Sequence, residues 1–157
     1  MNITVIAAGK LKESYFRDAA AEYAKRLSRF VKLKIIEVPD EKIPDGAGEK
    51  QCQAILEREG QRMLAQYQGG FPVALCIEGD PLSSETFAEK IARVSMEHSQ
   101  ITFFIGGSLG LSPQVKQTAR LRLSFGRMTL PHQLMRIVLL EQIYRAYKIN
   151  ANESYHK

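Results

Sequence analysis

Apolar and polar positions along the chain follow two different periods. Short, β-branched or continuously apolar segments predict strands, and longer segments with apolar residues three and four positions apart predict amphipathic helices. The predicted strands span residues 2–8, 32–38, 73–77, 101–105 and 121–125. The predicted helices span 11–30, 51–66, 84–96 (after serine N-caps), a short segment from Pro113, and 132–148. Strands and helices alternate throughout, which predicts an α/β fold with a largely parallel sheet.

The apolar runs 73–77 and 101–105 do not alternate with polar residues, which is typical of strands buried on both faces of a parallel sheet. No internal repeat or linker divides the chain, so we expect a single domain over residues 1–157. Hydrophobic residues make up 45% and charged residues 25%, as in an ordinary globular protein. No apolar run predicts a membrane span and no signal peptide is recognisable, so we expect a cytoplasmic protein with free thiols at Cys52 and Cys76.

Positive charge is segregated along the chain, whose net charge is +5. No Asp or Glu occurs between Glu97 and Glu141, a stretch that carries Lys116, Arg120, Arg122, Arg127 and Arg136. A second basic concentration lies between Lys10 and Lys34. Segregated positive charge favours a polyanionic partner such as RNA. For the N-terminal concentration, a solvated helix face is an equally good interpretation.

Three predicted strands end in small or polar loops, at 75–79, 105–107 and 125–130. Because the carboxyl ends of parallel strands meet at one edge of the sheet, these loops predict a single ligand pocket there. The glycine spacing in 105–110 does not fit a dinucleotide fingerprint, and no acid follows to hold a ribose. The loop residues Met128, Thr129 and Leu130 are too apolar for an exposed turn. The loop either packs into the core or wraps a ligand such as an adenine ring, and spacing alone favours the core.

The terminal helix is apolar on most sides, more than one sheet face can cover, which favours a partner subunit. We therefore expect a charged residue at Leu139 or Ile143 to give monomers or insoluble protein. Arg136 and Arg145 are nine positions apart and point to opposite faces of the helix. Arg145 either binds a substrate anion or pairs with Glu141 one turn away.

His132 and the tail 155–157 admit both structural and functional interpretations, as a helix-cap residue and a frayed end or as substrate contacts. The sequence contains no hydrolase triad, no HExxH motif and no plausible metal cluster, so neither hydrolytic nor metal chemistry is supported.

The chain resembles the SPOUT-class methyltransferases, and among them the family that methylates N3 of a pseudouridine in large-subunit ribosomal RNA. The resemblance covers the whole length and is most specific in the segments 105–111, 128–136, 141–146 and 155–157. It implies an α/β fold with a C-terminal trefoil knot, a homodimer, S-adenosylmethionine as cofactor, and ribosomal RNA in the assembled ribosome as substrate.

The resemblance also implies roles for individual residues. The implied cofactor contacts are Leu75, Gly106, Phe125, Gly126, Arg127, Met128, Thr129 and Leu130. The implied substrate side consists of His132, Arg136, Arg145, Tyr155, His156 and Lys157. Added bulk at Gly106 is expected to block the cofactor and spare the fold.

Three rival functions fit the sequence less well. A ribosome-associated RNA-binding protein without catalysis would leave the three strand-end loops without a purpose. A SPOUT methyltransferase for transfer RNA or another base shares the fold but not the tail and the segment 131–132. A nucleotide-dependent oxidoreductase lacks its ribose-binding acid.

Overall fold

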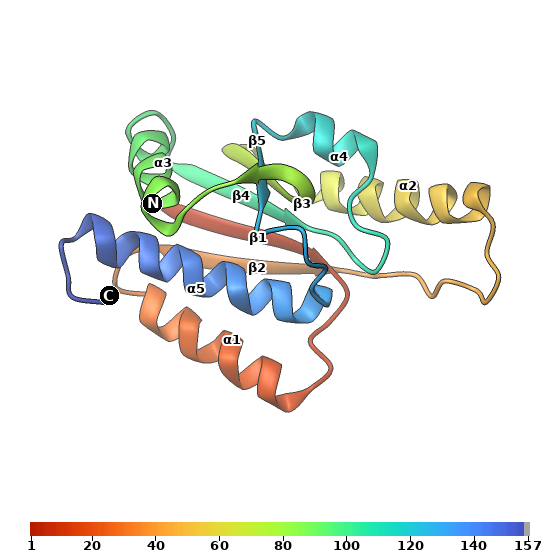
Figure 1. Ribbon diagram of the computed structural model, residues 1–157, viewed down its shortest axis with the longest axis horizontal. Coiled ribbons are helices and arrows are strands. Elements are labelled where there is room, and N and C mark those ends of the chain that lie inside the picture. Colours follow the sequence, from red (N-terminus) through yellow and green to blue (C-terminus); the bar gives the residue numbers. More distant parts are fainter. Residues whose placement is uncertain (156–157) are drawn as a thin grey trace.

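Five parallel strands form one sheet in the order β2-β1-β4-β3-β5 (Figure 1). The computed structural model describes residues 1–155. The strands are β1 (Asn2–Ala8), β2 (Lys32–Val38), β3 (Phe71–Pro81), β4 (Gln100–Ile105) and β5 (Leu121–Ser124). Since all five run in the same direction, their carboxyl ends share one edge of the sheet. The predicted α/β class with a parallel sheet is confirmed.

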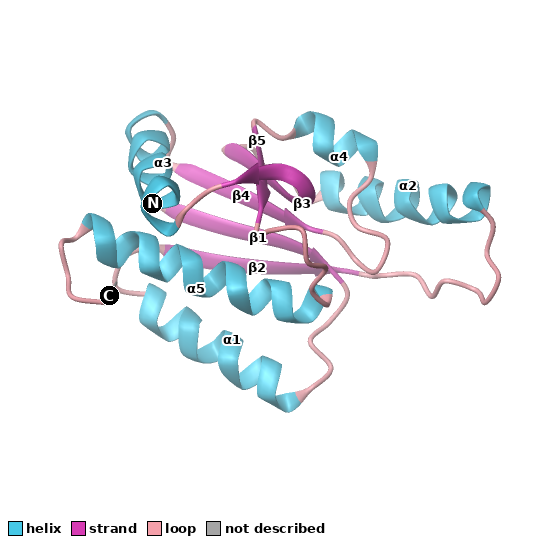
Figure 2. Ribbon diagram, viewed as in Figure 1, coloured by secondary structure: helices cyan, strands magenta, loops and turns pink. Residues whose placement is uncertain are grey.

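Helices cover both faces of the sheet (Figure 2). They are α1 (Ser14–Leu27), α2 (Glu49–Ala65), α3 (Ser84–Glu97), α4 (Pro113–Thr118) and α5 (His132–Asn150). The sheet separates two hydrophobic clusters, and alternate side chains of β1 point into one or the other. Val5 packs with α1, α3 and α5 in the larger cluster, and Ile6 packs with α2 and α4 in the smaller one. None of the helices in residues 1–155 is long and apolar enough to span a membrane.

Local signals placed the helix starts well. The Ser83 side chain accepts the backbone N–H of Thr86 at the start of α3, and the Ser112 side chain accepts that of Val115 at the start of α4. Strand β3 is longer than predicted. Its pairing with β5 breaks after Leu75 and resumes at Asp80, so the chain leaves the sheet and returns to it.

The apolar surface of α5 is mostly buried within the single chain, because α5 lies between α1 and α3 on the sheet. Leu139 and Ile143 are fully buried. These two positions are therefore not a dimer contact: a charge there would disrupt the core, which agrees with the expected insoluble protein and not with folded monomers. The half-buried apolar residues of α5 that lie outside the core clusters are Leu134 and Val138, one turn apart.

Candidate active site at the carboxyl edge of the sheet

A cavity of about 650 Å³ opens at the carboxyl ends of β3, β4 and β5. The structure brings together the three strand-end loops that the sequence singled out. Seven of the residues expected at the cofactor line the cavity: Leu75, Gly106, Phe125, Gly126, Met128, Thr129 and Leu130. Arg127 is exposed and does not line it. A volume of this size is typical of a small-molecule site.

The glycine loop after β4 is a tight turn. Gly107 and Gly110 face each other in an isolated bridge, and Gly110 has a φ of +81°, a conformation that favours glycine. A Cβ on Gly106 would lie 2.2 Å from the carbonyl oxygen of Gly110. The expectation that bulk at Gly106 spares the fold is therefore wrong, because it would collide with backbone before reaching a ligand.

Below this loop lies a buried carboxylate that the sequence analysis did not single out. Glu59 of α2 is 5% exposed, and its Oε2 accepts the backbone N–H of Glu41 at 2.9 Å. A Cβ on Gly107 would lie 3.3 Å from Glu59 Oε1. Burial raises the pKa of Glu59, and the hydrogen bond from Glu41 opposes that shift. Glu59 thus links the segment after β2 to the glycine loop.

The loop that follows β5 forms the other wall of the cavity. The Ser124 hydroxyl donates to the Ile77 carbonyl at 2.9 Å and accepts the Gly126 N–H at 3.1 Å, which ties this loop to the end of β3. Met128 is 86% exposed and Thr129 is also exposed. The interpretation that these residues pack into the core is wrong; they border an open cavity.

His132 begins α5 and lines the cavity. Its Nδ1 is buried and has no hydrogen-bond partner among residues 1–155. Burial lowers the pKa of His132, and the Asp40 carboxylate partly opposes this effect. The imidazole is therefore neutral at pH 7 and keeps a polar ring atom unsatisfied at the cavity.

Arg136, one turn further along α5, does not line the cavity. Its side chain is 1% exposed; Nη1 donates to Glu37 Oε2 at 2.6 Å and Nη2 donates to the Gly9 carbonyl at 2.9 Å. These bonds join the first turns of α5 to the carboxyl ends of β1 and β2. The expectation that Arg136 contacts substrate is not supported by this placement; in the single chain it positions the start of α5.

Arg145 and Tyr155 meet near the other end of α5. Arg145 pairs with Glu141 at 2.7 Å, and its guanidinium lies 4.8 Å from the centre of the Tyr155 ring. The Tyr155 hydroxyl donates to Glu141 Oε1 at 3.3 Å. Burial, together with Glu141, raises the pKa of Tyr155, so the phenol is neutral. His156 and Lys157 lie outside the described residues.

The two groups of predicted substrate residues are far apart within one chain. Arg145 follows His132 by thirteen positions in α5, which corresponds to about 20 Å along a helix. Neither Arg145 nor Tyr155 lines the cavity. The structure therefore brings Arg145 and Tyr155 together but separates both from His132.

The basic residues do not form one continuous surface. In the acid-free stretch, Lys116 pairs with Glu78 at the cavity, whereas Arg120 contacts His98 and Arg136 is buried. On and beside α1, by contrast, Lys10, Lys12 and Lys25 are exposed. No group of three or more potential ligand side chains is arranged to hold a metal ion within residues 1–155.

Comparison with known proteins agrees with this architecture. The chain is 55% identical to the ribosomal RNA large subunit methyltransferase H of Bifidobacterium animalis subsp. lactis and 51% identical to that of Leuconostoc citreum. Both alignments span 159 residues and cover 100% of each chain.

Solved structures share the fold at low sequence identity. A probable methylase family protein from Haemophilus influenzae matches with a TM-score of 0.55 at 12% identity, over 99% of this chain and 70% of that one. A Legionella pneumophila protein in complex with the bound cofactor SAM matches with a TM-score of 0.52 at 14% identity, over 94% and 66%. The family model described as "Predicted SPOUT methyltransferase" matches residues 1–156, and with the full-length relatives it shows that this chain belongs to the SPOUT methyltransferase family.

Proposed function

We propose that this protein transfers a methyl group from S-adenosylmethionine to N3 of a pseudouridine in large-subunit ribosomal RNA. The observation that carries the proposal is the cavity that the three strand-end loops form in a chain alike over its full length to ribosomal RNA methyltransferases. The proposed place of action is the ribosome in the cytoplasm.

The cavity suits S-adenosylmethionine. Leu75, Phe125 and Leu130 provide apolar walls for an adenine ring, and the backbone of the glycine loop can approach a ribose closely. His132 supplies a polar side chain at the cavity wall. The trefoil knot that the family resemblance implies is part of the proposal.

A homodimer completes the proposed site. Within one chain Arg145 is about 20 Å along α5 from His132, and Tyr155 lies against Arg145. Both can therefore serve the cavity only if they come from a second subunit. The pair Leu134 and Val138 offers apolar surface for that contact. Met128, an exposed apolar residue at the cavity, offers more.

The proposed chemistry needs positioning and charge rather than a metal. When bound, S-adenosylmethionine would supply an electrophilic methyl group, its sulfur–methyl bond breaking to leave S-adenosylhomocysteine. N3 of the base gives up its proton and forms the new bond to that methyl carbon. The Arg145 guanidinium stabilises the imide anion. His132 is neutral because burial lowers its pKa, so it can accept the proton.

The tail and the basic surface hold the RNA in this scheme. The Tyr155 ring lies against the Arg145 guanidinium. We expect Tyr155, His156 and Lys157 to contact the nucleotide. Exposed lysines on and beside α1, including Lys10, Lys12 and Lys25, contact phosphates.

Mixing two defective chains tests both the activity and its division between subunits. Arg145→Ala removes the anion partner, and deletion of 155–157 removes the tail; each homodimer should bind S-adenosylmethionine and fail to methylate large ribosomal subunits.

In the mixed dimer, the outcome depends on which chains supply the two elements. If Arg145 and the tail that serve one cavity come from the same partner chain, every site in the mixed dimer carries one lesion and no activity returns. If they come from different chains, one site is intact and part of the activity returns. Full activity of either homodimer would contradict the proposed roles.

A further inference from the structure

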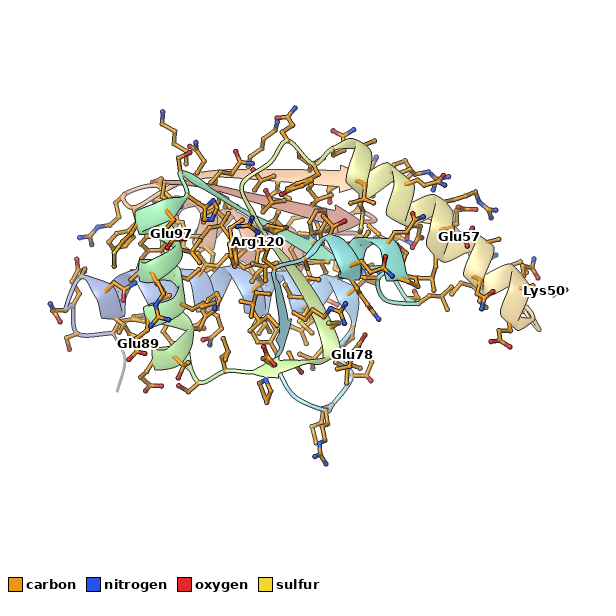
Figure 3. All side chains as sticks on the ribbon, turned by 90° about the horizontal axis from the view of Figure 1, so that it is seen from above. Lys50, Glu57, Glu78, Glu89, Glu97 and Arg120 are labelled. Atoms are coloured by element: carbon orange, nitrogen blue, oxygen red, sulfur yellow. The ribbon has the colours of Figure 1, made fainter. Side chains whose placement is uncertain are left out.

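Two opposite charges face each other at the edge of the cavity. Glu78 lies at the end of β3, where the chain turns back toward the sheet (Figure 3), and forms an ion pair with Lys116 of α4. Both side chains line the cavity. Among its described lining residues they are the two that carry a formal charge, since His132 is neutral.

Both residues are held by the surrounding backbone. Lys116 lies in α4, where its N–H bonds to the Ser112 carbonyl, and its own carbonyl accepts Arg122 Nε at 3.2 Å. Glu78 precedes Gly79, where a Cβ would lie 2.6 Å from the Arg122 carbonyl oxygen, so the chain is tightly packed there. The Lys116 ammonium lowers the pKa of Glu78, which keeps the carboxylate ionised.

An ion pair is an unusual element in a cavity whose other lining residues are mostly apolar or glycine, with Ser108, Thr129 and His132 as uncharged polar groups. The side chains are 26% exposed for Lys116 and 53% exposed for Glu78, so the pair itself contributes little to stability. Its exposure also leaves both charged ends free to exchange partners with a ligand. A ligand that offers one carboxylate and one ammonium would satisfy both.

We propose that Lys116 binds the α-carboxylate, and Glu78 the α-ammonium, of the methionine part of S-adenosylmethionine. This assignment rests on the proposed cofactor site, because it requires the cofactor in this cavity. It makes the pair a specificity determinant, which separates S-adenosyl ligands with an amino-acid end from adenosine thioethers without one.

Two ligands test the assignment by calorimetry without any turnover. S-adenosylhomocysteine carries the amino-acid end, and 5′-methylthioadenosine has the same nucleoside and thioether but lacks that end. We expect Lys116→Met and Glu78→Gln each to lower the affinity for S-adenosylhomocysteine by roughly three- to tenfold. Affinity for 5′-methylthioadenosine should stay unchanged.

Arg120→Met is the matched control, since it removes a positive charge that does not line the cavity. It should leave both affinities at wild-type values. Unchanged S-adenosylhomocysteine affinity in Lys116→Met and Glu78→Gln would overturn the inference. Equal weakening of both ligands would also overturn it, because damage to the cavity would then explain the loss.

Failure of the proposed cofactor site has a separate signature. Leu130→Trp fills the cavity and should abolish binding of both ligands. If both ligands bind Leu130→Trp as they bind the wild type, the cofactor lies elsewhere, and the proposed site and this inference fall together. If Leu130→Trp blocks both ligands while the charge variants bind normally, only this inference is contradicted.

Discussion

The two partners of the ion pair between Arg136 and Glu37 should contribute unequally to the free energy of unfolding. Arg136 is 1% exposed, whereas the Glu37 side chain is 36% exposed. Removal of Glu37 leaves a guanidinium that water cannot reach. Removal of Arg136 leaves a carboxylate that water can hydrate, together with the Gly9 carbonyl, which loses its bond from Arg136.

Magnitudes follow from this asymmetry. Breaking a buried pair so that a charge remains uncompensated costs about 3–5 kcal/mol, which we expect for Glu37→Ala. Arg136→Met replaces the charge with an apolar chain and leaves one buried acceptor unpaired, which costs about 1–3 kcal/mol. The double variant should cost less than the sum of the single variants, because the two side chains interact directly.

Urea unfolding followed by circular dichroism, at one protein concentration for all variants, measures these free energies. The predicted order is a larger loss for Glu37→Ala than for Arg136→Met. Wild-type stability of Arg136→Met combined with abolished methyl transfer would refute the reasoning, because Arg136 would then act on substrate and not on the position of α5.

Three further predictions concern titration and assembly. Burial lowers the pKa of His132, so on acidification the unfolded chain binds a proton at this residue before the folded chain does. Stability should therefore fall as the pH drops below about 6.5. His132→Gln should make that fall smaller, as thermal melts would show. Burial raises the pKa of Glu59, so its ionisation opposes folding as the pH rises above about 4.5; Glu59→Gln should gain stability relative to wild type over that rise, and a pH-independent difference would contradict this. In light scattering, Val138→Glu should give folded monomers and Leu139→Glu should unfold; a dimeric Val138→Glu would contradict the proposed interface.

Local sequence signals predicted most of the fold. Periodicity and helix-start signals together located the ten elements of residues 1–155, with the serine caps before α3 and Pro113 giving the starts of α3 and α4. The irregular end of β3 could not be predicted, because Asp80 and Pro81 are extended only through pairing with β5, about forty residues later. Such pairing depends on tertiary contacts and leaves no periodic trace.

The candidate site was predicted in position but not in detail. Parallel strands place their carboxyl ends together, so the three loops had to converge. The partner of Arg136 could not be read from α5, because Glu37 lies 99 positions earlier in the chain. The pattern of α5 gave the direction of Arg136 but not its burial. Glu59 belongs to a segment that shares the family resemblance, but nothing in the sequence placed its carboxylate below the glycine loop.

The central claim is methylation of one pseudouridine at N3 by this protein. Mass spectrometry of ribosomal RNA from cells with and without the protein, followed by mapping of the modified nucleotide, tests it most directly. We predict that one N3-methylpseudouridine in large-subunit RNA disappears without the protein and returns when the wild-type chain, but not Arg145→Ala, is restored. An unchanged large-subunit RNA, or a lost methyl group on transfer RNA or on another base, would contradict the account.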